Sequence, residues 1–311
     1  MQTESKTMEL VSVIIPNFNY ARFLKQRIDT VLNQTYKNIE IIILDDCSTD
    51  NSHEVIEQYR SNEKVKHIVY NKENSGSTFK QWQKGFELAK GDFIWIAEAD
   101  DFAEDTLLEK LMNVMNDNPQ IKLGFVNSFW ELPDKTFINQ DYTIPEKIRY
   151  YDGKEFVRSH LLKENYIYNA SMAVFRRDAL FQLSNNYMTF RSCGDKVFWK
   201  GIALQGTVVF VCEALNHFRI HSEKVTTNAI SSGLLFEEEN RFYHMNIEDN
   251  TINNGLRLDV INYFLKYIEN IKKDFVSEEA YNRSKSLWMK EKSFKNKSLP
   301  FLFRLICLFK K

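Results

Sequence analysis

Three carboxylates lie within four residues, at Glu98, Asp100 and Asp101, directly after the apolar run 93–97. Like charges this close repel one another, so these side chains must be well solvated or must bind a cation. Carboxylate oxygens are the ligands that Mg²⁺ and Mn²⁺ prefer. For these four residues taken alone, a solvated loop that caps a following helix is the simpler interpretation. The choice depends on which other polar groups the fold brings to the same place.

Short apolar runs alternate with segments of helical periodicity over the first 115 residues. The runs predict buried strands over 11–15, 40–44, 65–70 and 92–97, with helices over 21–33, 52–59, 78–89 and 105–115 between them. This alternation predicts a parallel sheet covered by helices, in which ligands bind beyond the carboxyl ends of the strands. Polar residues follow all four strands, at 17–19, 45–46, 71–76 and 98–101. The sequence therefore predicts one polar edge of the sheet.

The pattern is weaker after residue 120. It predicts strands over 123–130, 167–175 and 207–211 and a helix over 197–204, and the chain looks helical from about residue 231. We therefore predict two domains. Residues 1–228 form an α/β domain with a first half at about 10–118 and a second half at about 119–228, and residues 229–311 form a helical C-terminal region.

Composition excludes several classes of protein. A chain of 311 residues can bury a substantial core, and its formal net charge of −1 provides no general attraction for nucleic acid. The four cysteines have no metal-binding spacing. No apolar stretch reaches the roughly 18–20 residues that span a bilayer, and the first residues lack an apolar leader. We expect a cytoplasmic protein.

Several motifs in the first third of the chain resemble those of family 2 glycosyltransferases, which have the GT-A fold. The motifs are Val11-Ser-Val-Ile-Ile-Pro-Asn-Phe-Asn19, the segment 34–50, Asn74-Ser-Gly76, Ala89-Lys-Gly-Asp92 and the acidic cluster, in the order and spacing of the family. The resemblance implies a Rossmann-like α/β fold with a mixed, mainly parallel sheet flanked by helices. It also implies transfer of a sugar from a nucleotide diphosphate with Mg²⁺ or Mn²⁺ as cofactor.

The resemblance assigns a donor-binding role to the residues at the strand ends. They are Pro16, Asn17, Phe18, Asp45, Asp46, Asn74, Gly76, Glu98, Asp100 and Arg219. It implies that Asp46 accepts a hydrogen bond from the uracil N–H, which favours UDP, with Asp45 in support. Turn chemistry is the alternative for this pair. Phe18 would stack on the base or would be a core aromatic.

The metal ligands follow from the same resemblance. The Asp-x-Asp motif of the family is Glu98-Ala-Asp100 here, and the first position contacts ribose more often than metal. The ligand would be Asp100 or the adjacent Asp101, and the offset between them stays open. His221 would ligate the metal or contact a phosphate.

Catalysis by inversion requires a carboxylate that deprotonates the acceptor hydroxyl. Asp195 matches the position of this base in the family, and it would also be stabilised by the helix that it opens. Arg219 would neutralise diphosphate charge. Asn169 and Ser171 lie where the acceptor floor would begin, and Lys80 is either near the diphosphate or solvated.

The last residues, 298–311, are strongly apolar with basic residues at Arg304, Lys310 and Lys311. They predict either a helix at a membrane interface, at the inner face of the plasma membrane, or a segment packed on the domain or on a second copy in a homodimer.

The sequence thus predicts a metal-dependent, inverting glycosyltransferase. Its donor would be a nucleotide-diphosphate sugar, and its acceptor a saccharide or lipid-linked molecule of surface polysaccharide synthesis. A nucleotidyltransferase is an alternative, but Pro16-Asn-Phe-Asn19 stands where its glycine-rich phosphate loop would be. A catalytically inactive homologue that binds nucleotide sugars or acts as a scaffold is another, because Glu98 replaces the usual aspartate.

Overall fold

The computed structural model describes residues 8–134, 136–139, 146–220 and 225–308, and of residues 137–139, 225–226 and 294–308 it describes the backbone alone. The chain divides into two compact units. The first comprises Met1–Phe156, Tyr166–Thr189 and Gly194–Ser222, and the second comprises Val157–Asn165, Phe190–Cys193 and Glu223–Lys311. Each unit is described by itself.

Ten strands in the described residues form one sheet in the first unit, in the order β3-β2-β1-β4-β9-β6-β10-β5, with β7 beside β6 and β8 beside β10. The strands are β1 (Val11–Asn17), β2 (Ile39–Asp45), β3 (Val65–Tyr70), β4 (Phe93–Ile96), β5 (Phe102–Ala103), β6 (Ile121–Glu131), β7 (Phe137–Asn139), β8 (Ile148–Asp152), β9 (Ala173–Arg176) and β10 (Thr207–Arg219). β1, β2, β3, β4, β6 and β10 run in one direction, and the other four run in the opposite direction. The predicted mixed, mainly parallel sheet is confirmed.

The strand lengths create a step at the carboxyl edge of the sheet. β1 and β2 pair as far as Asn17 opposite Asp45, whereas β4 pairs with β1 only as far as Ile96 opposite Ile14. Pro16 lies beyond the last β1–β4 pair, where its missing N–H leaves no ladder bond unmade. The loop that follows β4 can therefore lie beside the ends of β1 and β2.

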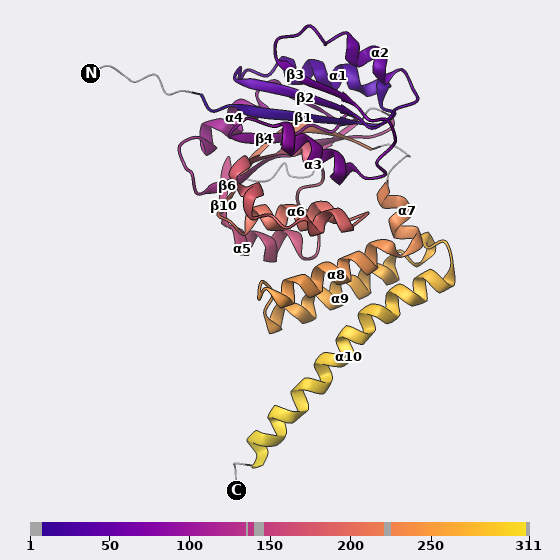
Figure 1. Cartoon of the computed structure of the whole chain (residues 1–311). Helices are drawn as coiled ribbons and strands as arrows, with labels where there is room; N and C mark the ends of the chain where they lie inside the picture. The colour runs from indigo at the N-terminus through magenta and orange to yellow at the C-terminus, as the bar shows by residue number, and fades with distance from the viewer. Residues whose placement is uncertain (1–7, 135, 140–145, 221–224, 309–311) are drawn as a thin grey trace, which may run out of the picture. The chain divides into compact units, whose positions relative to one another are not determined.

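Helices lie on both faces of the sheet (Figure 1). They are α1 (Ala21–Leu32), α2 (Ser52–Glu57), α3 (Thr78–Leu88), α4 (Leu107–Met115), α5 (Gly153–Phe156) and α6 (Gly194–Ala203), with 3₁₀ segments η2 (Ala170–Met172), η3 (Arg177–Gln182) and η4 (Asn185–Thr189). Every residue of β1, β2 and β4 is buried. Continuous apolar runs rather than alternating ones are expected for strands that are covered on both faces.

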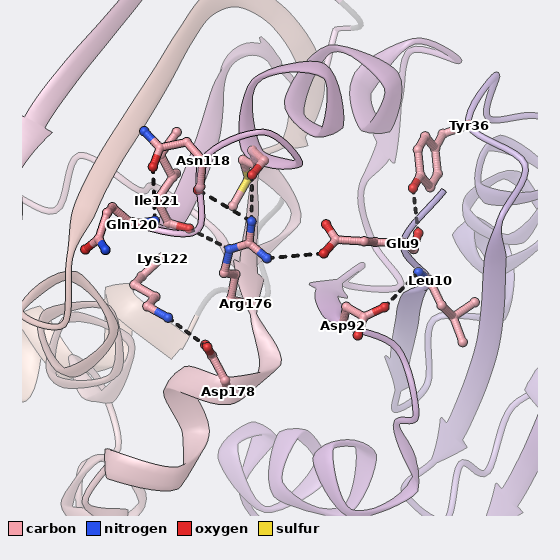
Figure 2. Close-up of polar contacts among 11 residues, drawn as sticks. Glu9, Leu10, Tyr36, Asp92, Asn118, Gln120, Ile121, Lys122, Arg176 and Asp178 are labelled. Carbon is pink, nitrogen blue, oxygen red and sulfur yellow. Dashed lines mark hydrogen bonds and ion pairs between the residues drawn. The ribbon is translucent and has the colours of Figure 1, made fainter. Parts of the chain in front are cut away.

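Arg176 ties several elements together at the opposite, amino-terminal edge of the parallel strands (Figure 2). Its guanidinium donates to the carbonyls of Met115 (2.7 Å) and Ile121 (3.1 Å), and it lies 3.6 Å from the Glu9 carboxylate and over the Phe93 ring. The carbonyls at the end of α4 have no partner within the helix, so this side chain satisfies groups that would otherwise be buried without hydrogen bonds.

The second unit is helical. It contains η1 (Val157–Leu161), α7 (Val225–Ser232), α8 (Leu234–Glu248), α9 (Asn254–Asn270), η5 (Lys272–Asp274) and α10 (Glu278–Leu308). Phe264 of α9 stacks on Trp288 of α10 at 4.4 Å, and the Trp288 indole donates to the carbonyl of Phe236 in α8. These buried aromatics make a small core for the helices.

Two predicted strands differ from the observed ones. The predicted strand 167–175 begins with the 3₁₀ turn η2, and only Ala173–Arg176 pairs in the sheet. The predicted strand 207–211 continues to Arg219, with irregular register against β6. The predicted domain division at residue 228 stays a prediction. Within the described residues, no helix is both long and apolar enough to cross a membrane.

Candidate active site

The ends of β1 and β2 are joined by side-chain hydrogen bonds. Asn17 Nδ2 donates to Asp45 Oδ1 (2.8 Å), and the same oxygen accepts from Ser48 Oγ (2.6 Å) while Oδ2 accepts from the Ser48 N–H (2.9 Å). Asn19, with φ of 59°, accepts from the Thr49 N–H. Asp45 thus shapes the two loops, as its turn-chemistry interpretation predicts, and Asn17 is almost fully buried beside it.

Asp46 organises the loop after β3. It is 5% exposed, and its Oδ1 accepts from Asn71 Nδ2 (2.6 Å), Gln81 Nε2 (2.8 Å) and the Ser75 N–H (2.9 Å), while Oδ2 accepts from Ser75 Oγ (2.7 Å). A carboxylate has about four lone-pair positions. An N–H of a bound nucleotide that donates to Asp46 would therefore replace one of these hydrogen bonds or share an oxygen with it.

The remaining predicted nucleotide contacts lie around these loops. Asn74 Nδ2 donates to the Asp46 carbonyl (3.1 Å), and Asn74 Oδ1 accepts from the N–H of Gly76, whose φ of +69° suits glycine. Phe18 is 43% exposed in the loop after β1, so it is not a core aromatic. Lys80 donates to the carbonyl of Ser75 from an exposed position.

Glu98 is held at three points by three different elements. Its N–H donates to Ser171 Oγ (3.0 Å), its carbonyl accepts from Arg27 Nε (2.9 Å), and its carboxylate Oε1 accepts from Trp82 Nε1 (2.8 Å). Arg27 lies on α1, Trp82 on α3 and Ser171 on η2. The beginning of the acidic loop, residues 98–101, is therefore fixed before any ligand binds.

Asp101 is 1% exposed and has protein donors at both oxygens. Oδ2 accepts from Ser171 Oγ (2.7 Å) and from Asn169 Nδ2, and Oδ1 accepts from the Arg219 N–H (3.3 Å). Asn169 Oδ1 in turn accepts from Asn216 of β10. Asp101 thus connects the acidic loop to the strands of the second half of the sheet, whereas Asp100 is partly exposed.

Burial and mutual repulsion perturb the charges of the acidic loop. Burial and the neighbouring Asp100 raise the pKa of Glu98 to about 8, and the same two causes raise the pKa of Asp101 to about 7. Arg27 is fully buried beneath the loop, and burial lowers its pKa to about 10 although Asp101 and Asp100 oppose the shift. Among the described residues, the two terminal nitrogens of Arg27 have no hydrogen-bond partner. Apart from the Nε hydrogen bond to the Glu98 carbonyl, the positive charge of Arg27 acts on the carboxylates of the loop through space.

Arg219 is hydrogen-bonded to groups of the acidic loop, of β6 and of α1. Its guanidinium donates to the Asp100 carbonyl (2.8 Å), to Glu131 (2.9 Å) and to Gln26, and it lies over the rings of Phe23 and Phe102. It contributes positive charge beside the acidic loop. Arg219 is also ion-paired with Glu131, so its positive charge is shared between that carboxylate and the acidic loop.

Asp195 lies in the first turn of α6, where its Oδ1 accepts from the Lys196 N–H (2.9 Å). Three and four residues later, Phe198 and Trp199 pack on Trp82, with ring centroids 5.4 and 6.3 Å away. Because residues three and four apart share one helix face, Asp195 lies on the face of α6 that packs against Trp82. His221 lies outside the described residues.

The chemistry of the acidic loop fits a hard divalent cation. No group of three His, Cys, Asp or Glu side chains converges on a metal position within the part of the chain that the structure describes. Mg²⁺ is commonly held by one or two carboxylates, with water and substrate phosphates completing its octahedral shell. A partly exposed carboxylate at Asp100, next to a buried and hydrogen-bonded one at Asp101, agrees with such a site.

Several site residues were absent from the sequence prediction. Arg27, Trp82, Gln81, Ser75 and Asn216 each bond to a predicted site residue or its neighbour. Only Arg27 carries a sequence signal, since it falls on the inward face of α1 with Leu24, Ile28 and Val31. A charged residue on an apolar face requires a partner.

Comparisons with known proteins agree with the family that the sequence motifs resemble. A family model described as Glycosyl transferase family 2 matches residues 12–183. The glycosyltransferase GlyG of Streptococcus pneumoniae is 30% identical over 142 residues, which cover 44% of this chain and 47% of GlyG, so the chain matches about half the length of that relative. TuaG of Bacillus subtilis, whose name links it to teichuronic acid biosynthesis, is 26% identical over 242 residues that cover 76% of this chain and 90% of TuaG.

Solved structures share the fold. TarS of S. aureus in complex with UDP-GlcNAc superposes with a TM-score of 0.57 at 16% identity, covering 93% of this chain and 90% of TarS 1–349. The mannosyltransferase PcManGT of Pyrobaculum calidifontis, solved with GDP-Man and Mn²⁺, superposes with a TM-score of 0.55 at 14% identity, covering 96% and 81%. At these identities the superpositions show the fold alone.

Proposed function

The chain belongs to glycosyl transferase family 2, and from that membership we propose that it moves a sugar from a nucleoside-diphosphate donor to a hydroxyl of a saccharide or lipid-linked acceptor in surface polysaccharide synthesis. UDP is the preferred nucleotide. The name of TuaG and the UDP-GlcNAc bound to TarS support this choice. The observation that carries the proposal is that the Asp46 loop and the acidic loop follow strands on either side of β1, at one edge of the sheet.

In this proposal the nucleotide lies across the ends of β1 and β2. Phe18 offers an exposed ring for the base, and Asp46 accepts the base N–H in exchange for one of its four loop hydrogen bonds. The other proposed donor contacts keep the loops in shape: Pro16, Asn17, Asp45, Asn74 and Gly76.

Asp100 is the proposed protein ligand for Mg²⁺ or Mn²⁺, and His221 is proposed as a further ligand. When bound, such a cation offsets the negative charge that develops on the departing nucleotide. Asp101 positions the loop instead of binding the metal, because both of its oxygens already accept hydrogen bonds and it is 1% exposed. Arg219 adds positive charge beneath the diphosphate.

Asp195 is the proposed general base. The acceptor oxygen attacks the anomeric carbon, its proton passes to the Asp195 carboxylate, and the bond from the anomeric carbon to the phosphate oxygen breaks. The bonding pair leaves with the nucleotide diphosphate, and the attack from the opposite side inverts the anomeric centre. A positioned carboxylate of this kind contributes about 10²- to 10⁴-fold to the rate.

Thermal shift with a panel of UDP, GDP and dTDP sugars tests the donor assignment. A ligand that binds only the native state raises its stability by about 2.7 kcal/mol at 100 times its Kd. We expect one UDP sugar to raise the melting temperature with Mn²⁺ present and to do so much less with EDTA. A panel in which no nucleotide sugar raises the melting temperature would contradict the proposal.

A nucleotide-sugar-binding protein without turnover is the second candidate. The observation that favours it is that Glu98, at the first position of the acidic motif, accepts a hydrogen bond from the Trp82 indole. Measured turnover separates the two functions. A donor that binds with Mn²⁺ but releases no nucleotide in the presence of acceptor extracts would favour the binding protein.

A further inference from the structure

The side chain of Glu98 joins the acidic loop to the helix that carries the proposed base. Its Oε1 accepts from the indole N–H of Trp82 at 2.8 Å, and the Trp82 ring packs on Phe198 and Trp199 of α6. We propose that Trp82 and Glu98 form a positioning pair that sets Asp100 relative to Asp195. The inference rests on the proposed function, because the distance between these two carboxylates matters only if Asp100 binds the metal and Asp195 is the base.

The Trp82 ring is enclosed, so its N–H has a fixed direction. The residue is 3% exposed, and it meets Phe79 edge-on at 5.1 Å as well as Phe198 at 5.4 Å. An indole has a single donor and no acceptor. A buried indole N–H that loses its acceptor is left without water and without a hydrogen bond, which costs free energy. The positions of α3 and α6 therefore determine where the Glu98 oxygen must lie to accept this hydrogen bond.

The backbone of the acidic loop carries this constraint to Asp100. The Glu98 N–H and carbonyl are bonded to Ser171 and Arg27, so a shift of the Glu98 side chain cannot be absorbed by a free backbone. Two residues later, the carbonyl of Asp100 is bonded to Arg219. A change at the Trp82–Glu98 hydrogen bond must therefore displace either the loop or α6.

Side-chain length explains why this position holds glutamate. An aspartate carboxylate lies one C–C bond, about 1.5 Å, nearer to the backbone. Starting from 2.8 Å, that retreat takes the oxygen beyond hydrogen-bond distance of the indole. Glutamine has the length of glutamate and keeps a carbonyl oxygen for the indole, although it has no charge. If the pair positions the loop, length is required at residue 98 and charge is not.

The opposite interpretation makes a contrary prediction. If Glu98 acts by its negative charge on ribose or metal, Glu98→Asp keeps that charge and stays active, whereas Glu98→Gln removes it. Trp82→Phe keeps an aromatic ring at this position but deletes the N–H together with part of the indole, so a control for the smaller ring is needed. Trp130→Phe is the matched control, because the Trp130 indole N–H is buried without a hydrogen-bond partner in the described part of the chain, and its ring packs on Tyr168 and Phe218.

The experiment measures kcat and donor KM for wild type, Glu98→Gln, Glu98→Asp, Trp82→Phe, Trp130→Phe and the double variant Trp82→Phe/Glu98→Asp. We expect kcat to fall about 10- to 100-fold in Glu98→Asp and in Trp82→Phe, with KM changed less, because small misplacement of catalytic groups has that cost. Glu98→Gln should retain more activity than Glu98→Asp, and Trp130→Phe should stay near wild type. The double variant should be no slower than the slower single variant, because each single change already removes the same hydrogen bond, between Trp82 and Glu98.

Two results would overturn the pair: Glu98→Asp more active than Glu98→Gln, or losses that multiply in the double variant. A wild type without turnover would count against the proposed function and not against the pair. In that case the same set of variants is compared by the Mn²⁺-dependent rise in melting temperature that the sugar donor causes. Glu98→Asp and Trp82→Phe should reduce that rise non-additively while Glu98→Gln retains it, and additive reductions would again overturn the pair.

Discussion

Two adjacent aspartates, Asp100 and Asp101, have different surroundings and should respond differently to the same substitution. Both oxygens of Asp101 accept protein hydrogen bonds in a buried position, whereas Asp100 is partly exposed and adds repulsion to Glu98 and Asp101. From this difference we propose that Asp101 maintains the structure of the acidic loop and that Asp100 binds the ligand.

Asp101→Asn should therefore lower the free energy of unfolding by about 2–3 kcal/mol, because the new amide N–H₂ would face donors from Asn169 and Ser171. Asp100→Asn should keep or slightly raise stability, because it removes a like charge, and it should weaken Mn²⁺ binding at least tenfold. Urea unfolding and Mn²⁺ titration measure the two effects. Equal destabilisation by both variants would contradict this division of roles.

The elements that carry the site depend on buried charged side chains away from it. Arg176 bonds carbonyls at the end of α4 and the start of β6, at the edge of the sheet opposite to the site (Figure 2). A lysine has no planar fork and cannot make these bonds together. Such side chains hold the frame on which the strand ends are aligned.

Arg176→Lys should cost about 2 kcal/mol of stability and leave donor affinity unchanged. Lys122→Met is the control, because it breaks the nearby ion pair with Asp178 in Figure 2, whose carboxylate is exposed, and should cost less than about 1 kcal/mol. Urea unfolding gives both values. The prediction is wrong if the two variants are equally stable.

In the second unit, Glu238 of α8 holds an irregular segment by its backbone. The buried carboxylate accepts from the N–H groups of Arg191 (2.7 Å), Ser192 (2.8 Å) and Cys193 (3.1 Å). Glu238→Gln leaves one oxygen for three donors and should lower stability by about 2 kcal/mol. The neighbouring Glu237→Gln affects only an exposed pair with Arg283 and should cost about 0.5 kcal/mol or less. Thermal unfolding with a similar loss for both variants would count against this role.

Local patterns predicted the first four strands and their helices well, because each is a continuous apolar run or a helical stripe. The predicted strand 167–175 was wrong in its first half. Ser171 there turns to bond Glu98 and Asp101, and no local signal announces partners some 70 residues away. Trp82 and Asn216 were missed for the same reason. The family resemblance located the acidic loop and Asp195, and their roles stay predictions.

At the scale of the whole molecule, the sheet unit and the helical unit are each compact, and α10 continues to Leu308. The sequence of 298–311 is apolar with basic residues, which predicts either contact with a membrane surface or packing on the domain or on a second copy, and we propose the membrane contact. Deletion of 298–311 should reduce the fraction that sediments with anionic vesicles and leave donor binding in place. An unchanged sedimenting fraction would contradict the membrane role of this segment.

Family membership supports the proposed sugar transfer, and the alignment of the strand ends supports our proposal that it takes place at this edge of the sheet. β1, β2 and β4 bring the Asp46 loop and the acidic loop to one edge, and α6 brings Asp195 onto the face that packs against Trp82. The central claim is that this edge catalyses metal-dependent sugar transfer with Asp195 as base.

The most direct test measures nucleotide release from the UDP sugar that binds, with Mn²⁺ and acceptor present, for wild type and Asp195→Asn. We predict that Asp195→Asn binds the donor with wild-type affinity but turns over at least about 100-fold more slowly, and that EDTA stops the wild type. Turnover by Asp195→Asn at the wild-type rate, or a wild type that is indifferent to EDTA, would contradict the account.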